Sequence, residues 1–183
     1  MLPYTDSSGG TDVWTVLENV DQHPTDASSI ICVYSETPRL KTDHTVDTGW
    51  NREHVWCKSY GVGYEGADTS DVHSFRAADC TVNSSRNNRY LDDCTTTDPV
   101  CTMGSTEAVN TLRSTGIAGS TGLWTPPPSN KGDLARSMFY MALRYDGDEP
   151  FTYQLELSNS PDETIYRIPL SLPSCRSHTF DTH

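Results

Sequence analysis

Residues 50–59 have the sequence Trp-Asn-Arg-Glu-His-Val-Trp-Cys-Lys-Ser and open the segment that decides the fold. A glycine-rich turn follows, then Ser-Asp-Val-His at 70–73 and Asp-Cys-Thr-Val-Asn-Ser-Ser-Arg-Asn-Asn at 79–88. In this segment short apolar pieces alternate with Gly, Asp and Ser, and two of the six histidines, His54 and His73, lie beside carboxylate and amide residues. The segment therefore holds most of the unusual chemistry of the chain.

The charge of the chain changes along its length. In total, 13 Lys and Arg oppose 25 Asp and Glu, and the net charge of −12 argues against loose electrostatic binding to DNA or to anionic membranes. Residues 1–49 carry 2 positive and 8 negative charges, whereas residues 50–90 carry 5 of each. Phosphate contacts are local and charge-assisted, so a neutral segment of an acidic protein is able to hold a phosphate. The cations of residues 50–90 are Arg52, Lys58, Arg76, Arg86 and Arg89.

Length and hydropathy bound the class of protein. A chain of 183 residues and 20.3 kDa suits one globular domain. Its mean hydropathy is −0.58, and no apolar run approaches the roughly 18–20 residues that a bilayer span needs. We therefore expect a protein of one domain, and we do not expect a membrane protein. Residues 1–6 contain neither a basic nor an apolar stretch, so we expect no signal peptide within the chain as given.

Six cysteines without a C-x-x-C pair favour disulfides over a zinc ribbon or a thioredoxin-like redox site. We expect at least two bridges in an oxidising compartment, with scattered buried thiols as the alternative. Cys94 and Cys101 flank a polar loop and make the simplest local pair, while the other pairings stay open. The protein is then secreted or periplasmic, with its signal sequence removed or outside the given chain. The other cysteines are Cys32, Cys57, Cys80 and Cys175.

Hydrophobic periodicity predicts two helices. Residues 12–20 carry apolar side chains at i, i+3, i+4 and i+7, and Thr11 and Asp12 are the candidates for the cap. Residues 131–145 carry a longer apolar face directly after three prolines, where Ser129 or Asn130 is placed to cap the helix. This face predicts a core helix and consists of Leu134, Met138, Met141, Ala142 and Tyr145.

The remaining segments predict strands and loops. Ile30–Tyr34 is compact and rich in β-branched side chains, which predicts a buried strand ended by a polar turn. Residues 151–157 alternate between apolar and polar and are a second strand candidate. From residue 92 to residue 130 the composition turns to Thr, Ser, Gly and Pro, which predicts long loops over the core.

Four blocks of sequence occur in a distinctive order. They are N-R-E-H-V-W at 51–56, D-x-H at 71–73, V-N-S-x-R-x-N at 82–88, and the helical stretch that contains K-G-D-L-A-R and F-Y-M-A-L-R-Y at 131–145. From about residue 12 to about residue 157 the chain resembles the secreted bacterial endonuclease I family. The resemblance implies an α+β fold, with helices and short antiparallel strands around a ββα-metal (His-Me finger) active site, and nonspecific nuclease activity.

The resemblance also implies a role for each residue of the site. Hydrolysis of a phosphodiester needs a nucleophilic water, a cation on the phosphate and neutralisation of charge on the leaving oxygen. In the family the histidine of the Glu-His pair is the general base, which is His54 here; imidazole titrates near neutral pH. The preceding Glu53 and the downstream Asn83 bind a single divalent ion. Their oxygen ligands suit Mg²⁺ better than Zn²⁺.

Several cationic and imidazole side chains have more than one interpretation. Arg86 and Arg52 are candidate phosphate ligands, and we count Arg86 among the catalytic residues. The alternative for both arginines is a structural role in packing. The family's product-stabilising arginine lies in the loop between the two strands, but residues 59–70 contain no arginine. That role stays open, with Lys58 or Arg86 as substitutes. His73 is expected to orient the unit through a hydrogen bond.

The adjacency of Glu53 and His54 constrains the backbone. Neighbouring side chains on a regular strand point to opposite faces, so the pair serves one phosphate only if the strand ends or bulges there. We therefore expect irregular backbone at this pair. Strands near 52–57 and 71–76, and a helix from about residue 78 that carries Asn83, would complete the ββα unit.

These expectations define one endonuclease I-like domain over residues 1–183, with its ββα core at about 50–90. Residues 158–183 lack the N-R-N-P-F-type segment of the family and are interpreted as divergent or truncated. The expected function is a secreted, Mg²⁺-dependent, nonspecific endonuclease that acts as a monomer on the backbone of DNA and also of RNA. The alternative is a catalytically inactive, disulfide-stapled binding domain on the same scaffold.

Overall fold

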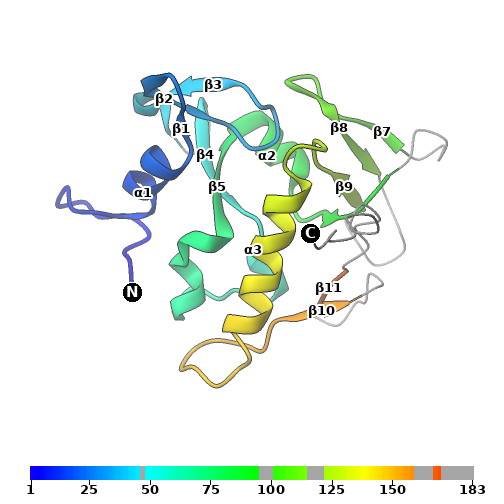
Figure 1. The fold of residues 1–183 in the computed structure, drawn as a ribbon. Coiled ribbons are helices and arrows are strands. Elements are labelled where there is room, and N and C mark those ends of the chain that lie inside the picture. Colours follow the sequence, from blue (N-terminus) through cyan, green and yellow to red (C-terminus); the bar gives the residue numbers. More distant parts are fainter. Residues whose placement is uncertain (46–47, 95–100, 115–121, 159–166, 170–183) are drawn as a thin grey trace, which may run out of the picture.

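The computed structural model describes residues 1–45, 48–94, 101–114, 122–158 and 167–169, which form a mixed α+β fold (Figure 1). Short 3₁₀ turns lie at Lys41–Asp43, Lys58–Tyr60, Ala67–Ser70 and Val72–Ser74. The helices and strands, in chain order, are α1 (Val13–Val20), β1 (Gln22–His23), β2 (Asp26–Ile31), β3 (Pro38–Leu40), β4 (Trp50–His54), β5 (Phe75–Asp79), α2 (Cys80–Arg86), β6 (Tyr90–Leu91), β7 (Cys101–Ser105), β8 (Ala108–Ser114), β9 (Leu123–Thr125), α3 (Lys131–Arg144), β10 (Glu156–Ser158) and β11 (Arg167–Pro169).

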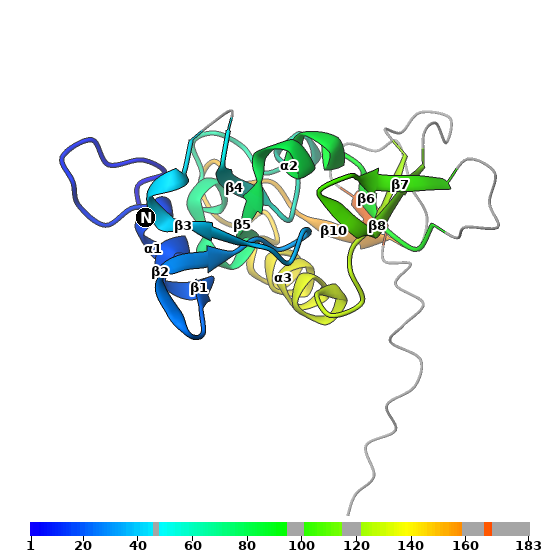
Figure 2. The ribbon, with the colours of Figure 1, turned by 90° about the horizontal axis from the view of Figure 1, so that it is seen from above.

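The antiparallel pair β4–β5 lies at the centre of the fold, with α2 on one side of it and α3 on the other (Figure 2). A small sheet in the order β1-β2-β3 packs near α1, and a sheet in the order β6-β9-β8-β7 lies at the opposite end of the molecule (Figures 1 and 2). β10 and β11 form a short parallel pair. Among the described residues no helix is long and apolar enough to cross a membrane.

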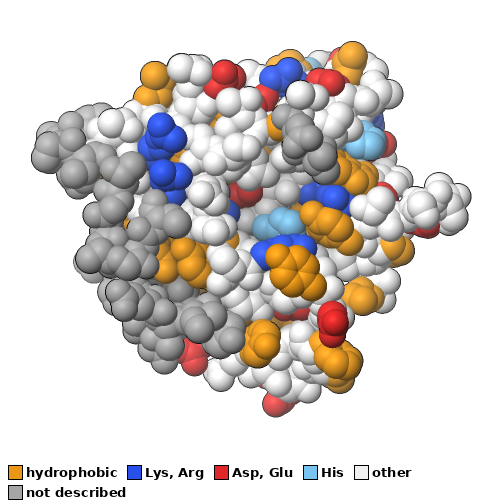
Figure 3. Space-filling model, turned by 180° about the vertical axis from the view of Figure 1, so that it is seen from behind, with side chains coloured by type: hydrophobic (Ala, Val, Ile, Leu, Met, Phe, Trp, Pro, Cys, Tyr) orange, Lys and Arg blue, Asp and Glu red, His pale blue; other side chains and the backbone are white. Residues whose placement is uncertain are grey.

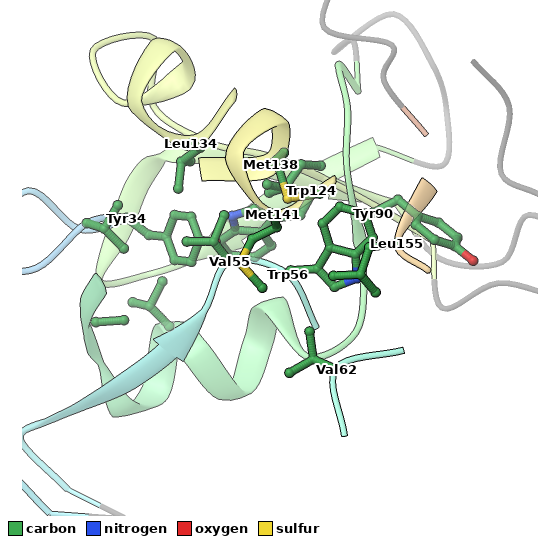
Figure 4. Close-up of a cluster of buried hydrophobic side chains, with 14 of the residues drawn as sticks. Tyr34, Val55, Trp56, Val62, Tyr90, Trp124, Leu134, Met138, Met141 and Leu155 are labelled. Carbon is green, nitrogen blue, oxygen red and sulfur yellow. The ribbon is translucent and has the colours of Figure 1, made fainter. Parts of the chain in front are cut away.

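The two predicted helices are confirmed. Asp12 caps α1, because its Oδ1 accepts the backbone N–H of Thr15 at 2.9 Å, and the helix buries Val13 and Leu17. Asn130 precedes α3, but its side-chain amide donates to the carbonyl of Val33 and does not cap the helix. The main core forms where α3 meets the end of β4 and β9 (Figure 4). It includes Val55, Trp56, Trp124, Leu134, Met138 and Met141.

The predicted strand at 30–34 is displaced in the structure. β2 begins at Asp26 and ends at Ile31, and residues 33–35 form a turn. Val33 and Tyr34 lie outside the strand but are buried in the core, so their apolar character reports packing and not strand conformation. The candidate strand at 151–157 is also wrong over most of its length, because β10 begins only at Glu156.

The prediction of long loops between residues 92 and 130 is wrong where β7, β8 and β9 form. Each of these strands carries a threonine, a β-branched residue that favours strands although it is polar. Thr111 is fully buried on β8 and donates its hydroxyl to the carbonyl of Ala108 at 2.6 Å. Gly104 on β7 lies so close to Trp124 and Thr111 that a Cβ atom there would clash with both. Polar and small side chains therefore pack this sheet.

One disulfide is confirmed, between Cys94 and Cys101. It joins the segment after β6 to the first residue of β7. The expectation of a second bridge is wrong for the other described cysteines: Cys32 and Cys57 are buried thiols, and the Cys80 thiol lies 3.1 Å from the carbonyl oxygen of Thr48. Cys175, with the predicted divergent C-terminal segment beyond residue 169, lies outside the described residues.

A candidate nuclease site between β4 and α2

β5 runs directly into α2 without a loop, and the helix packs against β4. Asp79 ends β5 and caps α2, because its Oδ1 accepts the backbone N–H groups of Thr81 at 2.9 Å and Val82 at 3.3 Å. The expected helix start is therefore confirmed, and Asn83 lies on α2 as expected. The expected strand at 71–76 begins later, at Phe75, because residues 72–74 form a 3₁₀ turn.

The irregular backbone expected at Glu53 and His54 is not found. The β4–β5 ladder continues without a shift through both residues, which pair with Arg76 and Phe75, and the strand ends at His54 instead of near residue 57. The two side chains leave opposite faces of the strand: Glu53 contacts α2, whereas His54 contacts the aromatic ring of Phe75. The end of the strand at His54 lets both residues line one pocket.

Glu53 lies in a buried polar cluster. Its Oε1 accepts the Tyr34 hydroxyl at 2.6 Å and lies 3.2 Å from Nη1 of Arg86. Burial raises the pKa of Glu53, and the positive charge of Arg86 and the Tyr34 hydrogen bond act in the opposite direction. The carboxylate is therefore held in place by a partner from α2 and a partner from the turn after β2.

Arg86 is buried and fixes the end of β4. Besides its ion pair with Glu53, it donates from Nη1 to the carbonyl of His54 at 3.1 Å and from Nη2 to the carbonyl of Val55 at 3.0 Å. Carbonyl groups at the end of a strand lack donors from a neighbouring strand, and Arg86 provides donors for two of them. The same side chain thereby sets the backbone that carries His54.

His54 is covered by aromatic rings. The ring of Phe75 lies 4.4 Å from the imidazole, centroid to centroid, and the ring of Tyr4 stacks on it at 5.8 Å. Its Nε2 is buried and has no hydrogen-bond partner among the described residues. Burial, the largest cause, and the positive charges of Lys58, Arg52 and Arg86 together lower the pKa of His54 to about 3. The imidazole is therefore neutral at neutral pH.

Asn83 faces β4 from α2. Its Nδ2 donates to Oδ1 of Asn51 at 2.7 Å, and its Oδ1 accepts no hydrogen bond from the described residues. A pocket of about 310 Å³ brings Asn83 together with Glu53, His54 and Arg86, so the four site residues predicted from the sequence line one hollow. The remaining lining residues are Asn51, Arg52, Cys57, Lys58, Ser84, Asn87 and Asn88.

The pocket has two further cations at its edge. The guanidinium of Arg52 stacks 3.5 Å from the centroid of the Tyr4 ring and donates to Oγ1 of Thr5 at 2.9 Å. Nζ of Lys58 lies 4.7 Å from the same ring centroid. Arg89 does not face this pocket, because it donates to the carbonyls of Ser85 and Ser114. Tyr4 was not found by sequence reasoning, because no motif marks it and the contact joins distant parts of the chain.

His73 lies outside this pocket. Its ring stacks on Tyr140 of α3 at 4.1 Å, and its Nδ1 lies 3.0 Å from Oδ1 of Asp71. Oδ2 of Asp71 accepts the hydroxyls of Tyr140 at 3.0 Å and Tyr145 at 2.8 Å. The Asp-x-His block therefore ties the start of β5 to α3, on the side of the hairpin away from α2.

Two oxygen-bearing side chains of the pocket, Glu53 and Asn83, are the candidates for holding a hard cation. The described residues contain no group of three or more His, Cys, Asp and Glu placed to hold a metal. A Glu53 carboxylate and the Asn83 amide oxygen form a smaller set, which suits an ion such as Mg²⁺ that keeps several of its waters. A softer ion such as Zn²⁺ would need nitrogen or sulfur ligands that this pair lacks.

Comparison with known proteins gives the family of the chain. A sequence profile described as Endonuclease I matches residues 3–170, and the chain belongs to this family. It is 36% identical over 151 residues to a protein of Bacillus subtilis (strain 168) named extracellular ribonuclease. It is 34% identical, again over 151 residues, to a protein of Bacillus amyloliquefaciens with the same name.

Each alignment covers 81% of this chain but only 48% and 47% of the two relatives. The chain therefore spans about half the length of these curated relatives. No solved structure matches the chain significantly.

Proposed function

We propose that this protein is a secreted, Mg²⁺-dependent endonuclease that hydrolyses phosphodiester bonds in RNA and DNA. The observation that carries the proposal is the single pocket that joins a neutral histidine on β4, His54, to a carboxylate and an amide oxygen from Glu53 and Asn83. Membership of the endonuclease I family supports the reaction class. The names of the two relatives support an RNA substrate and an extracellular location.

His54 is the proposed general base. In this role Nε2 would accept a proton from water, and it has no hydrogen-bond partner from the described residues that would compete for its lone pair. Arg86 holds the His54 carbonyl and the Glu53 carboxylate at once, so it acts as a positioning residue. Being only 2% exposed, it is not placed to reach a phosphate itself.

Glu53 and Asn83 would hold the metal ion. When bound, Mg²⁺ supplies positive charge to the scissile phosphate and to the leaving oxygen. Lys58 lies at the edge of the pocket and is the cation best placed to contact the phosphate of a substrate. It therefore substitutes for the arginine that the loop between the strands lacks.

The first test is cleavage of single-stranded RNA and of supercoiled plasmid by the purified protein, with Mg²⁺ and with EDTA. We expect degradation of both substrates in Mg²⁺ and none in EDTA. Intact substrates in Mg²⁺ at micromolar protein would reject the nuclease and favour the alternative, an inactive binding domain on this scaffold. Cleavage that persists in EDTA would reject the metal.

A further inference from the structure

Three exposed aromatic side chains line a second hollow, and one of them, Tyr64, contacts Lys58 of the His54 pocket. Tyr64, Phe151 and Tyr153 are 80%, 73% and 52% exposed. With Glu65 and Thr152 they line a hollow of about 380 Å³. Aromatic surface gathered in this way on a soluble protein marks an interaction site, because isolated exposed rings are ordinary but grouped ones are not. Figure 3 shows a face of the molecule on which hydrophobic side chains lie next to Lys, Arg and His.

The backbone at Phe151 is held in an unfavourable conformation. Its φ of 63° lies in the left-handed region, which bulky side chains avoid, and its ring is nevertheless exposed to solvent. Strain of this kind persists only where the surrounding structure fixes it, and it concentrates at functional sites. This conformation places the Phe151 ring at the surface, where it lines the hollow.

Two backbone segments fix the aromatic rings relative to each other. Gly66 lies against the Phe151 carbonyl, and a Cβ atom at residue 66 would lie only 2.5 Å from that oxygen. The loop that carries Tyr64 is closed by Gly63 N–H, which donates to Asp68 Oδ2 at 3.3 Å, and by the Thr69 hydroxyl, which donates to the Gly63 carbonyl at 3.0 Å. The aromatic surface is therefore formed before any ligand binds.

Lys58 connects the aromatic hollow to the His54 pocket. It lines the pocket, and its Nζ lies 4.4 Å from the centroid of the Tyr64 ring, which lines the hollow. The pocket is lined by cations, whereas the described lining of the hollow contains an acid, Glu65, and neither Lys nor Arg. The pocket therefore suits a phosphate, and the hollow suits an uncharged, flat, aromatic group.

We propose that Tyr64, Phe151 and Tyr153 form a base-binding subsite, in which an unpaired nucleobase stacks while Lys58 contacts the neighbouring phosphate. The ligand is a single strand of nucleic acid, because bases stacked inside a duplex do not present their faces to a protein. The subsite deepens the proposed nuclease function and rests on it for the cleavage step. It makes an unpaired strand the preferred substrate of the same site.

Binding and cleavage test the subsite separately. The probes are a fluorescein-labelled oligoadenylate, an abasic oligonucleotide of the same length, and a fully paired duplex. The variants are Tyr64→Ala and Phe151→Gly. Glycine at residue 151 removes the ring and adopts a positive φ without strain, so the thermal unfolding midpoint of Phe151→Gly is expected to stay constant or rise. Phe139→Ala is the matched control, because it removes an exposed aromatic ring of α3 that lines neither hollow.

In EDTA we expect wild type to bind oligoadenylate more tightly than the abasic strand. Each subsite variant should lower the oligoadenylate affinity by about 5- to 100-fold, with the abasic affinity unchanged. In Mg²⁺, kcat/KM for oligoadenylate should fall by a similar factor in both variants, while duplex cleavage stays constant in Phe151→Gly, which leaves the Tyr64 ring beside Lys58 in place. Variants that bind oligoadenylate as wild type does, or a wild type that binds the abasic strand equally well, would overturn the subsite. If the wild-type protein binds oligoadenylate more tightly than the abasic strand but does not cleave it in Mg²⁺, the nuclease function is rejected and the base-binding subsite is not.

Discussion

Arg86 gives the clearest prediction at the scale of a single residue. It is the counter-charge of the buried Glu53 carboxylate and also holds two carbonyls at the end of β4. We expect Arg86→Met to lower the free energy of unfolding by about 3–5 kcal/mol, because it leaves a buried charge without a partner. The check is urea unfolding. Arg136→Met is the control: its ion pair with Asp133 is exposed, so its effect should stay below about 1 kcal/mol.

The metal prediction also concerns single residues. We expect Glu53→Gln and Asn83→Ala each to shift the Mg²⁺ concentration needed for activity upward, because two protein groups hold the ion against its own hydration shell. Isothermal calorimetry with Mg²⁺ measures this directly, without any substrate. Ser84→Ala, a change at a neighbouring lining residue, should leave the affinity unchanged. Unaltered Mg²⁺ affinity in both variants would remove Glu53 and Asn83 from the metal site.

At the scale of an element, the start of α2 decides where Asn83 lies. Asp79 accepts two N–H groups of the first turn, so Asp79→Ala should destabilise the protein by about 0.5–2 kcal/mol. Asp79→Asn keeps an effective cap and should recover most of this loss in thermal unfolding. An asparagine variant as unstable as the alanine variant would mean that the charge contact with Arg39, and not the cap, matters most.

Elements differ in how well the sequence predicts them. The helices α1 and α3 follow from apolar periodicity, because each packs one face on a core. β7 and β8 escape such reasoning, because their buried positions include Thr111 and Ser114, and no apolar alternation marks a polar sheet. The convergence of Glu53, His54 and Asn83 follows from the family resemblance and not from local pattern. Contacts between distant segments, such as Tyr4 on His54, have no local signal at all.

At the scale of the whole molecule, net charge opposes binding of a polyanion. The chain carries −12, and its potential phosphate contacts are few: Arg86 and Arg89 are committed to carbonyls, and Arg52 lies beneath Tyr4. Few contacts give a shallow dependence of affinity on salt, and screening relieves the overall repulsion. We therefore expect cleavage rates at subsaturating DNA and fixed Mg²⁺ to stay flat or rise across a NaCl series. A steep monotonic fall would reveal a strong basic groove.

The most direct test of the account replaces each of the two motif histidines with alanine. Cleavage of single-stranded RNA in Mg²⁺ is measured for wild type, His54→Ala and His73→Ala, with circular dichroism to confirm the fold of each variant. His54 lies in the pocket with Glu53 and Asn83, whereas His73 lies on the far side of the hairpin against Tyr140. We expect His54→Ala to lower kcat by about 10²–10⁴-fold and His73→Ala to retain most of the activity. A folded His54→Ala variant that cleaves at the wild-type rate, while His73→Ala does not, would contradict the assignment of the active site to this pocket.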